Sequence, residues 1–329
     1  MDNLEIYKAK VKVIGIGDCG NNIISSLKRF AITNLELIAV NTDAKKLYYT
    51  DADKKVLFGE KITKGFGTGS NIEIAKKIAE LERDKISGLV KDTDIVFFIA
   101  GLGRGTGSGM LPCFSEVARE EGVLSVAILI WPSKIEGGAL KKRAEKTLSE
   151  IEGKIDSYII IENDKVRELF GMIPLQEAFF KTNKIISDML SNLNKMMFEP
   201  SELNIDFADV CTILKNTGMS TMSYFKTNDE KISPLEVSKQ LISNPLISRP
   251  IKKVKNALIH YNISEDIPIA DVMKIQDYLI RYMDTDGDIK YGVRNIDSVQ
   301  KMHKIEIFTI LAGIKTEESK KIDLGFEQV

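Results

Sequence analysis

The sequence predicts a doubly wound α/β domain, a long central helix and a smaller α+β domain. Three observations predict this fold class. Short runs rich in Ile and Val alternate with helix-like stretches through the first half of the chain. This alternation ends at about residue 165, where a long apolar-periodic stretch follows. The 329 residues are also enough to build two buried cores.

The first-half elements follow from two different apolar patterns. The strand-like runs are continuous rather than alternating, which is typical of strands buried on both faces of a parallel sheet. They span 11–17, 35–41, 94–101, 124–131 and 156–163. The helix-like stretches between them span 21–31, 71–85, 111–122 and 139–153. Strand and helix in alternation predict a parallel sheet covered by helices.

The second half changes character. Residues 174–197 are periodic in apolar residues and predict one helix, whose Phe and Met side chains are expected in the core. Residues 201–210 end that helix, and strand-like runs follow at 255–263, 289–296 and 304–313. The predicted divisions are the α/β domain at 11–172, the helix and its connection at 173–203, a C-terminal domain at 204–315 and a short polar tail at 316–329.

Composition and charge narrow the class of protein. The chain has 46 Lys and Arg against 47 Asp and Glu, so no overall field attracts nucleic acid, and we expect no direct nucleic-acid partner. No apolar run approaches the ~20 residues of a membrane helix, so we expect no membrane insertion. Three cysteines and two histidines argue against a disulfide framework and a zinc site, and we expect no metal held by the protein alone. A cytoplasmic protein is therefore expected.

Three glycine-rich loops point to a nucleotide. The first strand ends in "GIGDCG" at 15–20, an intact G-x-G-x-x-G, with Asp43 placed where a ribose-binding acid would follow. This pattern alone is typical of a dinucleotide site, so an NAD(P)-dependent enzyme is an alternative. The loops "GFGTGSN" at 65–71 and "GLGRGTGSG" at 101–109 add more bare backbone. Several loops suit a triphosphate better, because its oxygens need many N–H donors.

Five motifs together resemble the tubulin/FtsZ family. "GRGTGSG" resembles the tubulin signature GGGTGSG, with Arg104 in place of a glycine. The motifs "NTDAKKL", "IEGG", "ENDKV" and "NIDFADV" follow in the order found in FtsZ, at 41–47, 135–138, 162–166 and 204–210. The resemblance spans about residues 11–315. It implies a filament-forming GTPase that binds GTP or GDP with Mg²⁺.

The resemblance also implies which residues bind the nucleotide. Those matching phosphate and magnesium contacts are Gly17, Gly20, Asn21, Asn41, Asp43, Gly67, Thr68, Gly69, Gly103, Gly105, Thr106 and Gly107. Those matching sugar and base contacts are Asn22, Glu136, Asn163, Phe179 and Asn183. Leu140 stands where the family has an arginine, so Arg143 or Arg104 is expected to substitute for it.

The segment "NIDFADV" carries the expected catalytic residues, Asn204, Asp206 and Asp209. If it opens a helix, the two carboxylates share one face, and capping of that helix is a sufficient structural reason for them. The resemblance implies more, namely that they polarise a water at the γ-phosphate of a neighbouring subunit. Hydrolysis would then depend on assembly.

The implied partner is the chain itself in a head-to-tail homopolymer, with accessory assembly proteins as further partners. Cell division is the implied role. A specialised filament, such as one that segregates plasmid or phage DNA, is an alternative because residues 316–329 do not resemble the usual linker and tail peptide. An assembly protein that binds GTP without hydrolysing it is another, although the intact acidic pair argues against it.

Overall fold

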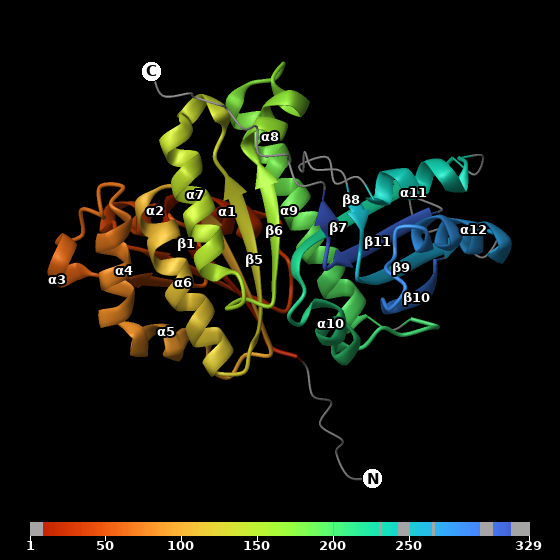
Figure 1. Ribbon diagram of the computed structural model, residues 1–329, viewed down its shortest axis with the longest axis horizontal. Helices are drawn as coiled ribbons and strands as arrows, with labels where there is room; N and C mark the ends of the chain where they lie inside the picture. The colour runs from red at the N-terminus through yellow and green to blue at the C-terminus, as the bar shows by residue number, and fades with distance from the viewer. Residues whose placement is uncertain are drawn as a thin grey trace, which may run out of the picture.

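The computed structural model describes residues 9–199, 201–229, 232–242, 251–264, 267–296 and 305–316. Most of the predicted tail at 316–329 lies outside this part of the chain. Figure 1 shows two lobes that share one continuous sheet, with helix α9 running between them. The order of the ten strands is β10-β9-β11-β7-β6-β5-β4-β1-β2-β3.

The first lobe is the predicted parallel sheet. Its six strands pair in parallel throughout, in the order β3-β2-β1-β4-β5-β6. They are β1 (Val11–Ile16), β2 (Leu35–Asn41), β3 (Lys54–Leu57), β4 (Ile95–Gly101), β5 (Leu124–Trp131) and β6 (Ser157–Glu162). The five predicted strands are confirmed to within one residue at each end. Strand β3 was not predicted, because it is short and begins with two lysines.

Helices cover both faces of this sheet, as predicted. They are α1 (Gly17–Arg29), α2 (Ala44–Tyr49), α3 (Glu60–Thr63), α4 (Ile72–Leu81), α5 (Arg83–Val90), α6 (Gly105–Glu120), α7 (Gly138–Ile151) and α8 (Asn163–Phe170). The single helix expected at 71–85 is divided at Glu82, whose carboxylate accepts the N–H of Gly59 at 2.9 Å. The helix expected at 111–122 begins earlier, within the third glycine loop.

Helix α9 (Leu175–Phe198) confirms the long helix predicted at 174–197. Its side chains Ile186, Met189, Leu190, Leu193 and Met196 are at most 2% exposed. They join the same hydrophobic cluster as residues of α1, the parallel sheet and β11. Met189 and Met196 therefore pack in the core as expected, whereas the expectation is wrong for Phe179 and Phe180, which are each 53% exposed.

The second lobe has the predicted α+β character. Its elements are α10 (Phe207–Leu214), β7 (Gly218–Thr227), α11 (Pro234–Ile242), β8 (Ile251–Lys253), β9 (Asn256–Ser264), α12 (Ile269–Ile280), β10 (Ile289–Ile296), β11 (Ile305–Ala312) and β12 (Lys315–Thr316). Strand β11 is antiparallel to both β7 and β9, and β10 is parallel to β9. Only two residue pairs, those of Ser157 with Gly218 and of Tyr158 with Met219, join β7 to β6.

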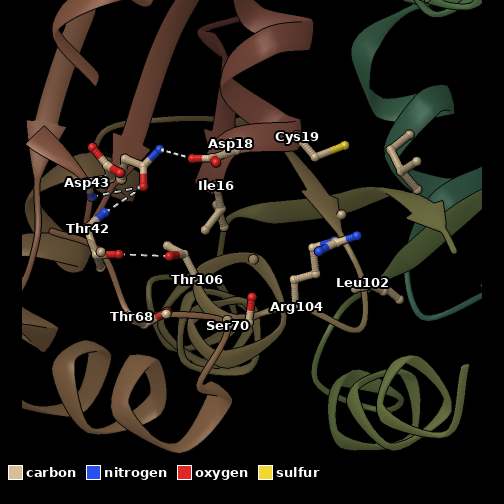
Figure 2. Close-up of a pocket in the computed structure, with 18 of the residues that line it drawn as sticks. Ile16, Asp18, Cys19, Thr42, Asp43, Thr68, Ser70, Leu102, Arg104 and Thr106 are labelled. Atoms are coloured by element: carbon tan, nitrogen blue, oxygen red, sulfur yellow. Dashed lines mark hydrogen bonds between the residues drawn. The ribbon is translucent and has the colours of Figure 1, made fainter. Parts of the chain in front are cut away.

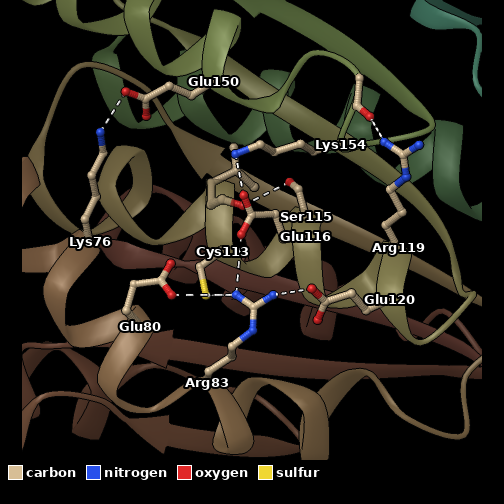
Figure 3. Close-up of polar contacts among 12 residues, drawn as sticks. Lys76, Glu80, Arg83, Cys113, Ser115, Glu116, Arg119, Glu120, Glu150 and Lys154 are labelled. Atoms are coloured by element: carbon tan, nitrogen blue, oxygen red, sulfur yellow. Dashed lines mark hydrogen bonds and ion pairs between the residues drawn. The ribbon is translucent and has the colours of Figure 1, made fainter.

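A network of ion pairs holds α6 to its neighbours (Figure 3). Arg83 of α5 lies 2.7 Å from Glu120 and 3.4 Å from Glu116, both on α6. Lys154, just after α7, pairs with Glu116 from the other side. This network fixes the carboxyl half of a helix whose first turn faces the cavity described below. None of the described helices is both long enough and apolar enough to span a bilayer.

Candidate functional site

A cavity of about 360 Å³ opens where β1, β2, β4 and β5 end (Figure 2). The carboxyl edge of a parallel sheet is where α/β proteins bind ligands. Residues from all three glycine loops line it, which explains why those loops recur in the sequence. The predicted residues that line it are Gly17, Asn41, Asp43, Gly67, Thr68, Gly69, Arg104, Gly105, Thr106, Gly107, Glu136 and Asn163.

Two helices begin at this cavity without a side-chain cap. Helix α1 follows Ile16 and α6 follows Arg104, and neither of these residues makes a capping hydrogen bond. The first N–H groups of a helix lack partners within it and carry the positive end of its dipole. Nearby, α2 and α4 are capped by the side chains of Asp43 and Asn71. The uncapped ends of α1 and α6 are therefore suited to an anion such as a phosphate.

The glycines here let helices and strands approach each other closely. A Cβ on Gly107 would lie 2.7 Å from the carbonyl oxygen of Gly101, and one on Gly20 would lie 2.2 Å from that of Ile99. Gly17 has φ of +74°, a conformation that favours glycine. Gly20 does not line the cavity, so its role is packing of α1 against the sheet. The cradle is thus shaped by contacts of the chain with itself.

Asn41 and Asn21 organise the loop after β2. The Oδ1 of Asn41 accepts the N–H groups of Thr42 at 2.8 Å and Asp43 at 3.1 Å, and its Nδ2 donates to Asp18 at 3.0 Å. Asn21 is 2% exposed and does not line the cavity. With its amide oriented to satisfy both ends, its nitrogen donates to a carbonyl of β1 and its oxygen accepts from Asn41. Both amides therefore hold protein groups.

Other lining residues were not predicted. The hydroxyls of Thr42 and Thr106 lie 2.8 Å apart, and the carboxylate of Asp18 lies 2.9 Å from Lys46. Further lining residues from the glycine loops are Cys19, Phe66, Ser70 and Leu102. The signal that could have found them is their place inside the motifs, between residues that were predicted.

Carboxylates outnumber cations among the residues that line the cavity. It is lined by three carboxylates, those of Asp18, Asp43 and Glu136, and Arg104 is the one cation among its lining residues. Arg104 Nη2 donates to Glu136 Oε2 at 2.8 Å. Burial raises the pKa of Glu136, but hydrogen bonds from Arg104 and the Ser133 N–H outweigh burial and hold that pKa below its ordinary value. Glu136 is therefore ionised at neutral pH.

Cys19 lies in the cavity but is not poised as a nucleophile. Burial raises the pKa of its thiol to about 12, and the carboxylates of Asp18 and Glu136 add to that effect. A thiol with such a pKa stays protonated at neutral pH, and the thiolate is the reactive form. Cys19 therefore lines the cavity as a small, neutral side chain.

The predicted base-side residues of α1 and α9 lie beside the cavity rather than in its lining. Asn183 Nδ2 donates to Ser26 Oγ at 2.8 Å, and Ser26 Oγ donates to the carbonyl oxygen of Asn22 at 3.1 Å. The structure therefore brings the two predicted asparagines together through one serine. Phe179 is 53% exposed, one helical turn before Asn183.

The two arginines considered for the place of Leu140 lie in different cavities. Arg143 lines a neighbouring cavity of about 460 Å³, whereas Arg104 lines the first one. Gly103 does not line the cavity: its φ is +91°, and a Cβ there would lie 2.7 Å from the carbonyl oxygen of Leu140. Leu140 itself is 8% exposed and packs beneath this loop.

The acidic segment caps helix α10 with its own carboxylates. Asp206 Oδ1 accepts the N–H of Asp209 at 2.8 Å, and Asp209 Oδ2 accepts the N–H of Asp206 at 3.2 Å. Lys290 of β10 lies 3.1 Å from Asp209 Oδ1. Asn204 accepts the N–H and the hydroxyl of Ser201, each at 2.8 Å. The predicted helix start is confirmed, and within the chain the carboxylates cap α10 while Asp209 also pairs with Lys290.

The acidic segment and the cavity lie at opposite ends of the molecule. In Figure 1 the arrowheads of β5 and β6, which mark the cavity edge, point away from α10. Asp206 is exposed at that far end. The two sites therefore do not meet within one chain. The described residues contain no group of three or more His, Cys, Asp or Glu side chains suited to a metal.

The fold and this cavity define a two-lobed nucleotide-binding protein, and comparisons with known proteins identify its family. The tubulin/FtsZ family, GTPase domain, matches residues 10–171. The cell division protein FtsZ of Methanothermobacter thermautotrophicus is 31% identical over 313 residues, which are 95% of this chain and 81% of that protein. FtsZ 2 of Methanocaldococcus jannaschii is 32% identical over 314 residues, with 95% and 82% covered.

Solved structures agree with this family. An FtsZ dimer from M. jannaschii superposes with a TM-score of 0.80 at 28% identity, covering 99% of this chain and 97% of that one. CetZ2 from Haloferax volcanii, a GTPγS-bound protofilament, has a TM-score of 0.78 at 20% identity, with 94% of each chain covered, and shares the fold.

The chain belongs to the tubulin/FtsZ family. It is a tubulin-like GTPase and a cytoskeletal filament protein. The predicted family, fold class and GTP hydrolysis are confirmed, and the NAD(P) alternative no longer has support.

Proposed function

We propose that GTP occupies the cavity with its phosphates at the uncapped starts of α1 and α6. The observation that carries this proposal is that pair of helix N-termini, because each offers N–H groups without a side-chain partner. Gly105, Thr106 and Gly107 supply the first turn of α6, and Gly67, Thr68 and Gly69 cover the γ-phosphate end. Glu136 and Asn163 take the sugar side, and Phe179 with Asn22 and Asn183 takes the guanine.

Magnesium completes this proposal by balancing charge. The cavity is lined by three carboxylates and one cation, so a triphosphate alone would meet a surplus of negative charge. Mg²⁺ is usually held by one or two carboxylates together with phosphate oxygens and water. Asp18, Asp43 and the paired hydroxyls of Thr42 and Thr106 are oxygen groups of the right kind. The metal would enter with the nucleotide, since the chain alone offers few ligands.

Hydrolysis is proposed to occur between subunits. The acidic segment lies at the opposite end from the cavity, so head-to-tail contact would bring Asp206 and Asp209 of one copy to the nucleotide of the next. Two carboxylates in that place can orient and polarise the attacking water, while Mg²⁺ offsets the charge of the phosphates. The dimeric and protofilament forms of the structural relatives support self-association.

The proposed cellular role is cell division in the cytoplasm. It rests on the names of the relatives, which are cell division proteins at 31–32% identity over most of this chain. Accessory assembly proteins are proposed as partners for the same reason.

One experiment tests nucleotide, assembly and hydrolysis together. The purified chain is sedimented with GTP, GDP, ATP or NADH, with and without Mg²⁺, and phosphate release is measured on the same samples. We expect pelleting and phosphate release with GTP and Mg²⁺, and phosphate release per subunit that rises with protein concentration. Equal assembly with ATP would contradict guanine recognition. Turnover per subunit that does not depend on concentration would contradict the shared site.

A further inference from the structure

Arg104 and Glu136 form an ion pair in the lining of the cavity. Arg104 comes from the third glycine loop and Glu136 from the loop after β5, 32 residues later. The Nη2–Oε2 distance is 2.8 Å, and the two side chains are 65% and 27% exposed. Both line the cavity, and Figure 2 shows the Arg104 side chain extending from the third glycine loop. The pair therefore joins the third glycine loop to the segment that follows β5.

Arginine at position 104 does not stabilise the start of helix α6. Arg104 is the N-cap residue of α6, where Ser, Thr, Asp or Asn would satisfy the free N–H groups and Arg does not. A cation at a helix N-terminus is also repelled by the helix dipole. Replacing Arg104 with a capping residue would stabilise the start of α6. Another interaction of Arg104 must therefore offset the helix stability that is lost. An anion at the same helix end would supply that interaction.

Glu136 is held in place by several donors. Its carboxylate accepts from Arg104 and from the N–H of Ser133 at 3.1 Å, and the side chain of Asn163 helps to lower the pKa of this carboxyl. An ionised carboxylate offers about four acceptor sites, so acceptor capacity remains for the hydroxyl of a sugar. Arg104 carries five N–H donors, and one of them, on Nη2, donates to Glu136. Donors therefore remain for a phosphate oxygen.

We propose that Arg104 is a specificity-determining residue that couples sugar recognition to phosphate recognition. Its guanidinium orients Glu136 toward the ribose hydroxyls and, with its remaining donors, binds a phosphate oxygen of the same nucleotide. This inference rests on the proposed placement of GTP. It makes the preference for ribose over 2′-deoxyribose depend on a residue in the phosphate loop. Without Arg104, Glu136 would lose one orienting bond and its negative charge would face the phosphates uncompensated.

The test is a double-mutant cycle with two nucleotides. The wild type, Arg104→Gly, Glu136→Gln and the double variant are titrated with GTPγS and with its 2′-deoxy analogue, below the concentration at which filaments form. Glycine is tolerated at an N-cap, so Arg104→Gly should fold, and circular dichroism checks this. Arg104→Lys keeps the charge but not the fork of donors. Lys141→Ala, an exposed cation of α7 outside the cavity lining, is the matched control for overall charge.

We expect Arg104→Gly to weaken GTPγS binding about ten- to a hundredfold, the range for hydrogen bonds to charged groups. The ribose preference should shrink by about tenfold at the same time, and Arg104→Lys should recover affinity more than preference. On the Glu136→Gln background, Arg104→Gly should change the ribose preference by less than about twofold.

Three outcomes would overturn the proposal. Equal loss of both nucleotides in Arg104→Gly would mean that Arg104 acts on phosphates alone. Independent effects of the two substitutions on the ribose preference would remove the coupling. No change, or a change matched by Lys141→Ala, would mean that Arg104 acts only through overall charge or not at all. If the wild type bound neither nucleotide, the proposed function itself would fail, which is a separate result.

Discussion

Helices α6 and α10 begin in opposite ways, and the difference separates the two parts of the proposed active site. Helix α6 follows an arginine that caps nothing, so its first N–H groups have no side-chain partner. Helix α10 is closed by a reciprocal pair, in which the carboxylates of Asp206 and Asp209 each accept the other's N–H. The first end can receive an anion, whereas the second has already received two from its own chain.

Because of this difference, one copy of the chain does not bring both its nucleotide cavity and its acidic segment to the same site. A phosphate approaching α10 would meet the two carboxylates of Asp206 and Asp209, which already accept N–H groups there. A carboxylate approaching α6 would compete with the nucleotide. The two helix ends are therefore complementary only when they belong to different copies of the chain. Four predictions test this comparison, from the largest expected effect to the smallest.

The largest effect is expected from the acidic segment. Asp209→Ala should still bind GTP and assemble, because the cavity lies at the other end of the molecule, but turnover should fall about 10²–10⁴-fold, as when a group that activates a nucleophile is removed. Its filaments should persist longer. Phosphate release and sedimentation on the same samples measure both. Wild-type turnover in filaments of this variant would rule out the shared site.

The second prediction concerns the cradle. A Cβ on Gly107 would lie 2.7 Å from the carbonyl oxygen of Gly101, so Gly107→Ala should displace the start of α6 and reduce GTP turnover by about 10²-fold, the cost of a misplacement of about 1 Å. Nucleotide binding and assembly should weaken together. The matched control is Gly88→Ala in α5, where a Cβ meets nothing within 4 Å.

A mixture of the two variants sharpens that comparison. Asp209→Ala has an intact cavity, and Gly107→Ala has an intact acidic segment. If Gly107→Ala enters mixed filaments, the mixture should release more phosphate than the sum of the two proteins measured alone. Strict additivity in filaments shown to contain both chains would contradict sites shared between copies.

The third prediction makes α6 resemble α10. Arg104→Ser places a capping hydroxyl at the start of α6, where the backbone of Arg104 is already extended. The free energy of unfolding without nucleotide should rise by about 1 kcal/mol, while GTP affinity falls about tenfold or more. Urea denaturation and nucleotide titration measure the two quantities. A variant that gained both stability and affinity would show that α6 does not need its uncapped end.

The smallest expected effect is a change in the free energy of unfolding, and it separates capping from chemistry in α10. Asp206→Ala removes the N-cap and should lower the free energy of unfolding by about 1 kcal/mol, whereas Asp206→Asn keeps a good cap and should cost a few tenths. Both variants lose the carboxylate, so both should lose turnover. If Asp206→Asn hydrolysed GTP at the wild-type rate, the charge at this position would have no catalytic role and capping would be its whole function.

Much of the fold could be predicted because buried parallel strands have a distinctive sequence. Runs such as "VKVIGI" and "LSVAILIW" became β1 and β5. Strand β7 was not predicted, because "GMSTMSYFKT" carries polar residues whose partners come from far along the chain. One of them, Ser220, accepts a hydrogen bond from Ser157 at 2.7 Å inside the sheet. Such pairing is invisible in one segment alone.

The early start of α6 could not be predicted for the opposite reason. "GTGSG" has poor helix propensity, so the helix was expected only from residue 111. Tertiary packing overrides this preference: a Cβ on Gly109 would lie 2.4 Å from that of Ala75 in α4. The sequence correctly indicated that bare backbone is needed here. It did not show that part of this requirement comes from helices packing together, rather than from the ligand.

The sequence predicted which residues line the site better than it predicted the contacts of their side chains. Twelve predicted residues line the cavity, but Asn41 holds neighbouring N–H groups and Asn21 lies behind the loop. Arg143 lines another cavity. These differences depend on where side chains point after the chain has folded, which motif spacing does not specify.

The separation of the cavity from the acidic segment determines how many nucleotides a filament can hydrolyse. In a single-stranded filament, every subunit holds one nucleotide, but a complete site exists only at a contact between two subunits. One end of each filament therefore carries a nucleotide that no neighbour can hydrolyse. A dimer would use half of its nucleotides and a long filament nearly all, so turnover per subunit would report mean length. The unhydrolysed nucleotide would always mark the same end, giving each filament a chemical polarity that follows from the placement of α10.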